Sequence, residues 1–197
     1  YTNYVQYVFN YNTRYHGNFG KWFGGAIFVS KATKLKNVKT NLTMNHAERQ
    51  GGGIFSTDTK HISVIDCTAF NNSAENGAGI YMNNVEYIVN FQSDYQSNSA
   101  KSNGGGISLK NALKLQNLNA KFISNNARQG GAIFVVNVVN ITFNNCSGRE
   151  NLARISGGVL YVENVDNVIN YNSVLTNNIA DAGGSVYATR VLHLMNS

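Results

Sequence analysis

The chain has 197 residues, no proline, a formal net charge of +6 and a pI near 9.3. The positive balance favours acidic partners, such as anionic glycans or membrane surfaces. Asn137 and Asn140 interrupt even the most apolar stretch, 132–143, so we expect no signal peptide in this segment and no direct membrane insertion of it.

The sequence repeats itself with a period that alternates between 27 and 26 residues. Each repeat is counted here from an aliphatic marker at position 0, so that +8 denotes the eighth residue after the marker. The seven markers are Ile27, Ile54, Ile80, Ile107, Ile133, Leu160 and Val186. A repeat of this regularity is typical of a solenoid, in which each repeat forms one coil.

The first part of each repeat is predicted to form strands. Apolar or small residues recur at positions 0, +2 and +8, and large and small residues alternate from +11 to +15, as in Val38, Thr40 and Leu42. A period of two indicates strands, and no segment offers a helical pattern. The sequence therefore predicts an all-β parallel solenoid of about seven coils, with three short strands per coil.

The next feature of each repeat is an asparagine at +18. Parallel stacking places equivalent residues about 4.8 Å apart, so each column becomes a ladder along the solenoid. We expect this asparagine ladder to be structural, because asparagine tolerates left-handed bends and bonds backbone groups in turns. It comprises Asn18, Asn45, Asn72, Asn98, Asn125, Asn151 and Asn178. A looser ladder at +10 contains Asn10, Asn37, Asn90, Asn117, Asn170 and Asn196, interrupted by Val64 and Phe143.

Each repeat closes with a small residue at +20, usually alanine, and a cluster of small residues before the next marker, such as Gly24, Gly25 and Ala26. The one-residue difference in repeat length lies between these two features. We expect a turn to absorb it there. The absence of proline agrees with this architecture, because a proline inside a coil would remove a ladder hydrogen bond.

Two tetrapeptides suggest a family. Phe-Ile-Ser-Asn at 122–125 and Tyr-Gln-Ser-Asn at 95–98 combine with Gly-Gly-Ala-Ile at 24–27 and 130–133. This pairing resembles the repeat of the chlamydial polymorphic outer membrane proteins, and similar repeats occur in surface proteins of some protists. The resemblance covers essentially the whole chain. It implies a right-handed parallel β-helix of the pectin-lyase-like fold, used as an exported adhesin or surface stalk.

Both ends of the chain fall in mid-repeat, so we expect a single β-helix domain, 1–197, that is a fragment of a longer solenoid.

The two cysteines are expected to be free. Cys67 and Cys146 both occupy position +13 but lie three coils apart, about 14 Å at 4.8 Å per coil. A disulfide needs Cα atoms within roughly 7 Å. We therefore predict buried thiols with no metal or redox role, and no cofactor.

Four N-x-Ser/Thr sequons are present, at Asn41, Asn71, Asn140 and Asn145. The strand alternation predicts that Asn41, Asn140 and Asn145 point outward, as glycan acceptors must. All four positions are candidate N-glycosylation sites. They indicate either a glycosylated, secreted protein of a eukaryote or chance matches in a chain with 32 asparagines.

A column of aromatic residues at +1 is the candidate contact ladder. If the markers point inward, this column points outward and forms an apolar stripe too large to leave bare without reason. It could stack on sugar rings, pack against a neighbouring chain or be covered by a missing segment. Alternatively, the strand is turned the other way, with the aromatics in the core and the isoleucines exposed, or the aromatic stacking only stabilises the coil. The ladder comprises Phe28, Phe55, Tyr81, Phe134, Tyr161 and Tyr187, with Ser108 in the remaining coil.

Charged residues give two weaker signals. Lys31, Lys34, Lys36 and Lys39 lie on or beside one coil, as a site for an acidic partner or simply as a solvated edge. No basic run with interleaved aromatics is apparent across several coils, so we expect no nucleic-acid binding. Polysaccharide lyases and hydrolases need clustered carboxylates or a basic residue. The best available pair is Asp66 and Asp94, and we assign no catalytic or metal-binding residue.

The sequence thus predicts a non-enzymatic, structural or adhesive segment of an extracellular or cell-surface protein. It would form a stiff rod whose outward ladders contact other chains, by lateral or end-to-end assembly, or surface glycans. The alternative is a carbohydrate-binding or polysaccharide-degrading pectin-lyase-like protein.

Overall fold

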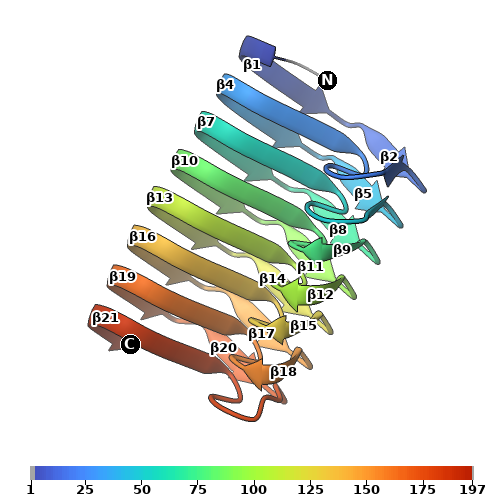
Figure 1. Cartoon of the computed structure of the whole chain (residues 1–197). Coiled ribbons are helices and arrows are strands. Elements are labelled where there is room, and N and C mark those ends of the chain that lie inside the picture. The colour runs from blue at the N-terminus through green and yellow to red at the C-terminus, as the bar shows by residue number, and fades with distance from the viewer. Residues whose placement is uncertain (1–2, 197) are drawn as a thin grey trace.

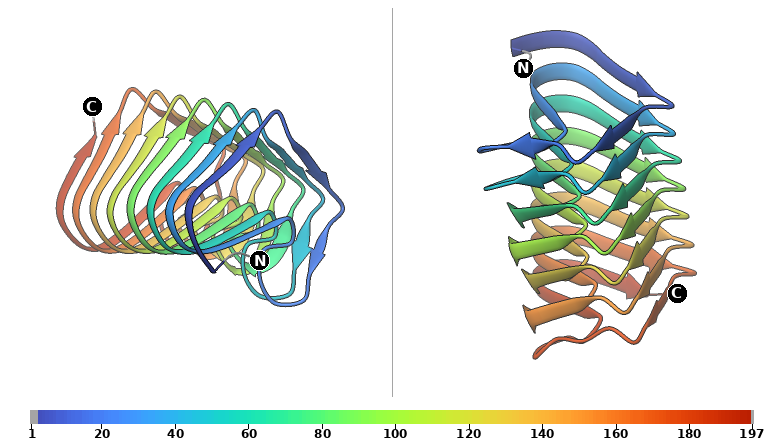
Figure 2. Two further views of the ribbon diagram at one scale, coloured as in Figure 1. Left: turned by 90° about the horizontal axis from the view of Figure 1, so that it is seen from above. Right: turned by 90° about the vertical axis from the view of Figure 1, so that its right-hand side faces the viewer.

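The chain folds as a parallel β-helix of about seven coils, with three strands in each coil (Figure 1). The computed structural model describes residues 3–196, and this part of the chain contains no helix. Successive coils repeat one outline when they are viewed from above (Figure 2). The predicted fold class is confirmed.

The longest strands form an eight-stranded parallel sheet, here called the long sheet. Each of its six central strands has 12 residues and begins at a marker. Its strands, in spatial order, are β1 (Asn3–Tyr11), β4 (Ile27–Val38), β7 (Ile54–Ile65), β10 (Ile80–Phe91), β13 (Ile107–Leu118), β16 (Ile133–Asn144), β19 (Leu160–Tyr171) and β21 (Val186–Asn196).

Two sheets of short strands complete each coil. The second sheet contains β2 (Arg14–His16), β5 (Asn41–Thr43), β8 (Thr68–Phe70), β11 (Asp94–Gln96), β14 (Lys121–Ile123), β17 (Ser147–Arg149) and β20 (Val174–Thr176). The third sheet contains β3 (Phe19–Gly20), β6 (His46–Ala47), β9 (Ser73–Asn76), β12 (Ser99–Asn103), β15 (Asn126–Gln129) and β18 (Leu152–Ser156).

Strand pairing follows the repeat columns. Ile80 pairs with Ile54 on one side and Ile107 on the other, so markers stack on markers. In the third sheet the register shifts between Ala100 and Asn103. The one-residue difference in repeat length is therefore absorbed between +20 and the glycine turn, as predicted.

The strand boundaries differ from those expected. Positions 0, +2 and +8 belong to one strand that bends at +4, and the alternation from +11 to +15 is divided by a second bend at +12. The third strand runs through the +20 column, which the sequence marked only by small residues. The positions that define these patterns keep even spacings across each bend. The sequence pattern therefore does not show where a strand bends.

Each coil turns at four residues with positive φ, at +4, +12 and +17 and at the glycine three residues before the next marker. In the coil that begins at Ile80 these are Asn84, Gln92, Ser97 and Gly104. Only the last position is glycine in every coil, because a Cβ on Gly104 would collide with the carbonyl oxygen of Ile107. The left-handed residue near the asparagine ladder is at +17, not at +18, so these asparagines do not adopt the bend conformation expected of them.

The core lies inside the three sheets. The coil that begins at Ile80 contributes Ile80, Met82, Val85, Ile88 and Tyr95, each at most 2% exposed. A smaller cluster of buried alanines includes Ala47, Ala74 and Ala100 of the third sheet. Within residues 3–196 no helix is long and apolar enough to cross a lipid bilayer.

Candidate contact surface

The +18 asparagines form a continuous hydrogen-bond ladder that is buried from Asn45 to Asn151. The backbone N–H and the Nδ2 of Asn98 both donate to Oδ1 of Asn125, at 3.1 Å each. Nδ2 of Asn98 also donates to the carbonyl oxygen of Ala69, 2.8 Å away in the preceding coil. The same pair of bonds, donated by each asparagine to Oδ1 of the asparagine in the next coil, repeats from Asn18 to Asn178. These bonds satisfy buried polar groups at a corner of every coil, which gives the ladder a structural role.

The ladder at +10 is interrupted, and its breaks leave buried polar atoms without partners. Nδ2 of Asn90 donates to Oδ1 of Asn117 at 3.0 Å. Where the next coil carries Val64 or Phe143, however, the Nδ2 groups of Asn37 and Asn117 are buried with no hydrogen-bond partner. A buried donor without a partner costs about 1–3 kcal/mol.

The aromatic column at +1 is not an open contact surface, which corrects the prediction of an outward ladder. Phe55, Tyr81, Phe134 and Tyr161 are only 5–7% exposed, and Phe28 and Tyr187 are half-buried. The glycine turns cross over this column: a Cβ on Gly77 would lie 2.9 Å from Cβ of Tyr81. Markers and aromatics are therefore both buried, on opposite faces of the strand.

Stacking within this covered column is regular. The rings of Phe55 and Tyr81 are 5.4 Å apart and 2° from parallel, and those of Phe134 and Tyr161 are 4.9 Å apart. Ser108 interrupts the stack, and its buried hydroxyl has no hydrogen-bond partner. The column stabilises the coil, as the alternative interpretation of the sequence held.

All four sequon asparagines lie at the surface. Asn41 and Asn145 are exposed and Asn140 is half-buried, in agreement with the predicted outward direction. Asn71, which the alternation did not place outward, is exposed as well, because it occupies the left-handed corner at +17. Asn41, Asn71 and Asn145 lie in or beside the second sheet, whereas Asn140 lies in β16 of the long sheet.

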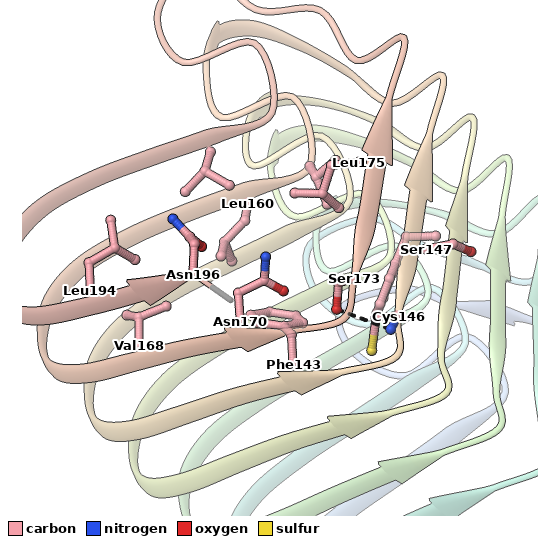
Figure 3. Close-up of a pocket in the computed structure, with 13 residues that line it drawn as sticks. Phe143, Cys146, Ser147, Leu160, Val168, Asn170, Ser173, Leu175, Leu194 and Asn196 are labelled. Carbon is pink, nitrogen blue, oxygen red and sulfur yellow. Dashed lines mark hydrogen bonds between the residues drawn. The ribbon is translucent and has the colours of Figure 1, made fainter.

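The cysteines are buried and free, as predicted. Burial raises the pKa of the Cys67 thiol, an effect only partly opposed by its contacts with Thr40 and Ile65. Cys146 lines a small apolar hollow of about 20 Å³ at the C-terminal end of the core (Figure 3). There its backbone N–H donates to Oγ of Ser173 at 3.1 Å. The other lining residues continue the core columns, so this hollow is part of the interior.

Asp66 and Asp94 do meet at one surface hollow. It has a volume of about 730 Å³, lies at the bend between the long and second sheets, and is completed by Gln92, Asn119, Lys121 and Asn145. Nζ of Lys121 is 3.8 Å from Oδ2 of Asp94, with both side chains about half exposed. An open ion pair of this kind is weak, because water screens it.

A stretch of the long sheet presents a different chemistry. Between the bends at +4 and +12, the side chains at +7, +9 and +11 point outward, while +8 and +10 are buried in most coils. We call this outward surface the basic-aromatic face. The +7 column contains Tyr7, Lys34, His61, Tyr87, Lys114, Asn140, Asn167 and His193. The +9 column contains Phe9, Lys36, Ser63, Val89, Gln116, Thr142, Ile169 and Met195. The +11 column contains Tyr11, Val38, Ile65, Phe91, Leu118, Asn144 and Tyr171.

The basic-aromatic face carries no aspartate or glutamate in these three columns. The acidic residues nearest in sequence lie at its two margins: Glu86 and Asp166 in the +6 column, and Asp66 at the +12 bend. Of the predicted basic group, Lys34 and Lys36 lie on the face, while Lys31 and Lys39 occupy its two bounding bends. All four lysines therefore lie on this surface or at its edges.

The first five members of the +7 column are all basic or aromatic. Nζ of Lys34 lies 5.9 Å from the ring centroid of Tyr7, and the rings of His61 and Tyr87 stack at 5.3 Å. The premise that no basic run with interleaved aromatics spans several coils is therefore wrong. The sequence concealed it because these residues lie 26 or 27 positions apart.

An exposed asparagine ladder at +4 was not predicted from the sequence. Nδ2 of Asn111 donates to Oδ1 of Asn84 at 3.2 Å, and Nδ2 of Asn137 donates to Oδ1 of Asn111 at 3.0 Å. Asp58 and Asn164 extend the ladder at its two ends. Its signal in sequence was the recurrence of Asn or Asp four residues after a marker.

Comparisons of the chain with protein-family models, with curated proteins and with solved structures found no match.

Proposed function

We propose that this chain is a non-enzymatic rod in an extracellular or cell-surface protein, and that it acts by presenting the basic-aromatic face to a partner. The partner is another protein chain or a surface glycan. The observation that carries the proposal is the face itself, which combines half-exposed aromatics with lysines and lacks carboxylates over three columns.

The interior supports a passive mechanism. Three parallel sheets, a buried asparagine ladder and a stacked aromatic column all repeat from coil to coil, so each coil is held by both neighbours. The outward side chains are consequently displayed on a regular lattice. Glycans on Asn41 and Asn71 would lie away from the basic-aromatic face, whereas Asn145 lies at its +12 bend and Asn140 lies in its +7 column.

A second candidate function rests on the hollow that holds Asp66 and Asp94. Carboxylates flanking a polysaccharide can act as acid and base, and Lys121 supplies a nearby cation. This hollow would serve a degrading enzyme of the pectin-lyase-like class. The ion pair in this hollow is open to solvent, whereas catalysis is favoured at sites that exclude water. This weakens the case for an enzyme.

The test incubates the purified chain with neutral and anionic polysaccharides, and measures both retention of the protein and the length of the sugar chains. A rod binds a partner and leaves every polysaccharide at its original length. Shortening that disappears in the Asp94→Asn variant would overturn the proposal and favour the enzyme. The control Asp58→Asn removes an exposed carboxylate outside the hollow.

A further inference from the structure

We infer that the partner of the basic-aromatic face is an anionic polysaccharide, a sugar polymer that carries carboxylates or sulfates. This inference rests on the proposed function and assigns the partner's chemistry. Three lysines on the face, with no carboxylate in its columns, make it complementary to a polyanion. The excess of basic residues in the whole chain acts in the same direction, through long-range attraction.

Two of the three lysines are held in place by the preceding coil. Nζ of Lys34 lies over the ring of Tyr7, and Nζ of Lys36 lies 5.8 Å from the ring centroid of Phe9. Both distances fall within the range of cation–π attraction. An ammonium group already held over a ring loses less freedom on binding than a free lysine does, so the pair is partly pre-organised for a ligand.

The spacing along the rod suits a linear polymer. Lys34 and Lys36 share one coil, and Lys114 follows three coils later, about 14 Å away at 4.8 Å per coil. Between and beyond them the outward columns carry neutral hydrogen-bonding groups, among them Ser63, Gln116 and Thr142. Separated charges with hydroxyl and amide groups between them match a chain of hydroxyl-rich rings with acidic substituents.

Ring orientation distinguishes this ligand from a single-stranded nucleic acid. Nucleic acids of this kind bind largely by stacking their bases on open aromatic faces. Here one face of the Tyr7 ring is covered by Lys34, and the ring of Tyr87 is stacked 12° from parallel with His61. These two rings therefore each have one face occupied within the protein, which leaves less open ring surface for a base to stack on.

The experiment measures retention on agarose coupled to heparin, to polygalacturonate or to neutral dextran, with elution by a sodium chloride gradient. The unmodified chain should be retained on both anionic supports and should pass through dextran. The double variant Lys34→Gln/Lys36→Gln should bind the soluble polymer more weakly. Its Kd should rise roughly tenfold, because two charge-assisted contacts are lost. The matched control is Lys101→Gln/Arg128→Gln, which removes two exposed cations from neighbouring strands of the third sheet.

Three results would overturn the inference. The first is an equal loss of affinity in the control and the test pair, which would make retention a matter of net charge. The second is tighter binding of a labelled single-stranded oligonucleotide that displaces heparin, which would assign the face to nucleic acid. If instead no polysaccharide binds but the lysine pair is needed for contact with a protein chain, the rod function stands and only its partner changes.

Discussion

At the scale of single residues, asparagine has two separate structural tasks in this chain. The +18 asparagines, buried in the five central coils, join the coils through their side chains, as at Asn98. Other asparagines, such as Asn84 and Asn111, occupy left-handed corners and lie at the surface. The first kind satisfies buried backbone groups, and the second lowers the cost of a positive φ.

Replacing a ladder asparagine should therefore cost far more than replacing a corner asparagine. In Asn98→Ala the carbonyl oxygen of Ala69 and the backbone N–H of Asn72 lose their partner, so we expect a loss of about 3 kcal/mol in the free energy of unfolding. The control Asn111→Gly keeps the positive φ and should change stability by less than about 0.5 kcal/mol. Urea unfolding measures both, and equal losses would refute the distinction.

The sequence predicted the columns at this scale but not the direction of every side chain. The asparagine ladder, the glycine turn and the free thiols follow from spacing alone, since each needs only the period. The burial of Tyr81 does not follow, because alternation assigns one face to the core and cannot show that the glycine turn folds back over the other. The basic-aromatic face was missed because its neighbours are a full coil apart in sequence.

At the scale of strands, the long strand is divided by its bend at +4 into two limbs with different surroundings. The aromatics of the first limb, such as Phe55, are covered by the glycine turn, while outward residues of the second limb, such as Tyr87, are 43% exposed. One strand thus supplies both a buried stack and the basic-aromatic face. The left-handed residue at the bend, Asp58 or Asn84 for example, separates the two.

The interrupted ladder at +10 gives a prediction for the inner side of the same limb. In Val64→Asn the new side chain should accept a hydrogen bond from the unpartnered Nδ2 of Asn37, which offsets the lost apolar burial. We expect its free energy of unfolding to stay within about 1 kcal/mol of the parent chain. Val85→Asn, at an equally buried position with no asparagine column, should lose about 3 kcal/mol.

Chemical denaturation of the two variants side by side provides the measurement. The substitution is the same in both, so differences in side-chain size and helix or strand preference cancel. If Val64→Asn is as damaging as Val85→Asn, then Asn37 does not gain a bond and the ladder is not extendable. A crystal structure of the Val64→Asn variant would show the new contact directly.

At the scale of the whole molecule, stability is a sum of contacts between neighbouring coils. Each inner coil pairs with two others, whereas β1 and β21 each pair with one strand of the long sheet. Side chains of β21 such as Leu194 and Met195 are correspondingly exposed. In such linear arrays the terminal units open more readily than the central ones.

Hydrogen exchange of the 197-residue chain should reflect this gradient. We expect the slowest amide exchange in β10 and β13, and progressively faster exchange towards β1 and β21. Mass spectrometry of peptic fragments measures it. Uniform protection along the chain would show instead that all coils unfold together, and that neighbour contacts do not set local stability.

The uniform sense of the buried asparagine ladder has an electrical consequence. In every step the Oδ1 atom accepts from the preceding coil, so the side-chain amide dipoles point the same way from Asn18 to Asn178. Sheet backbone dipoles largely cancel. The exposed +4 ladder has the opposite sense but is screened by water. The buried ladder therefore adds a dipole along the rod axis, negative towards the first coil and positive towards the last, which favours antiparallel over parallel alignment of two neighbouring rods.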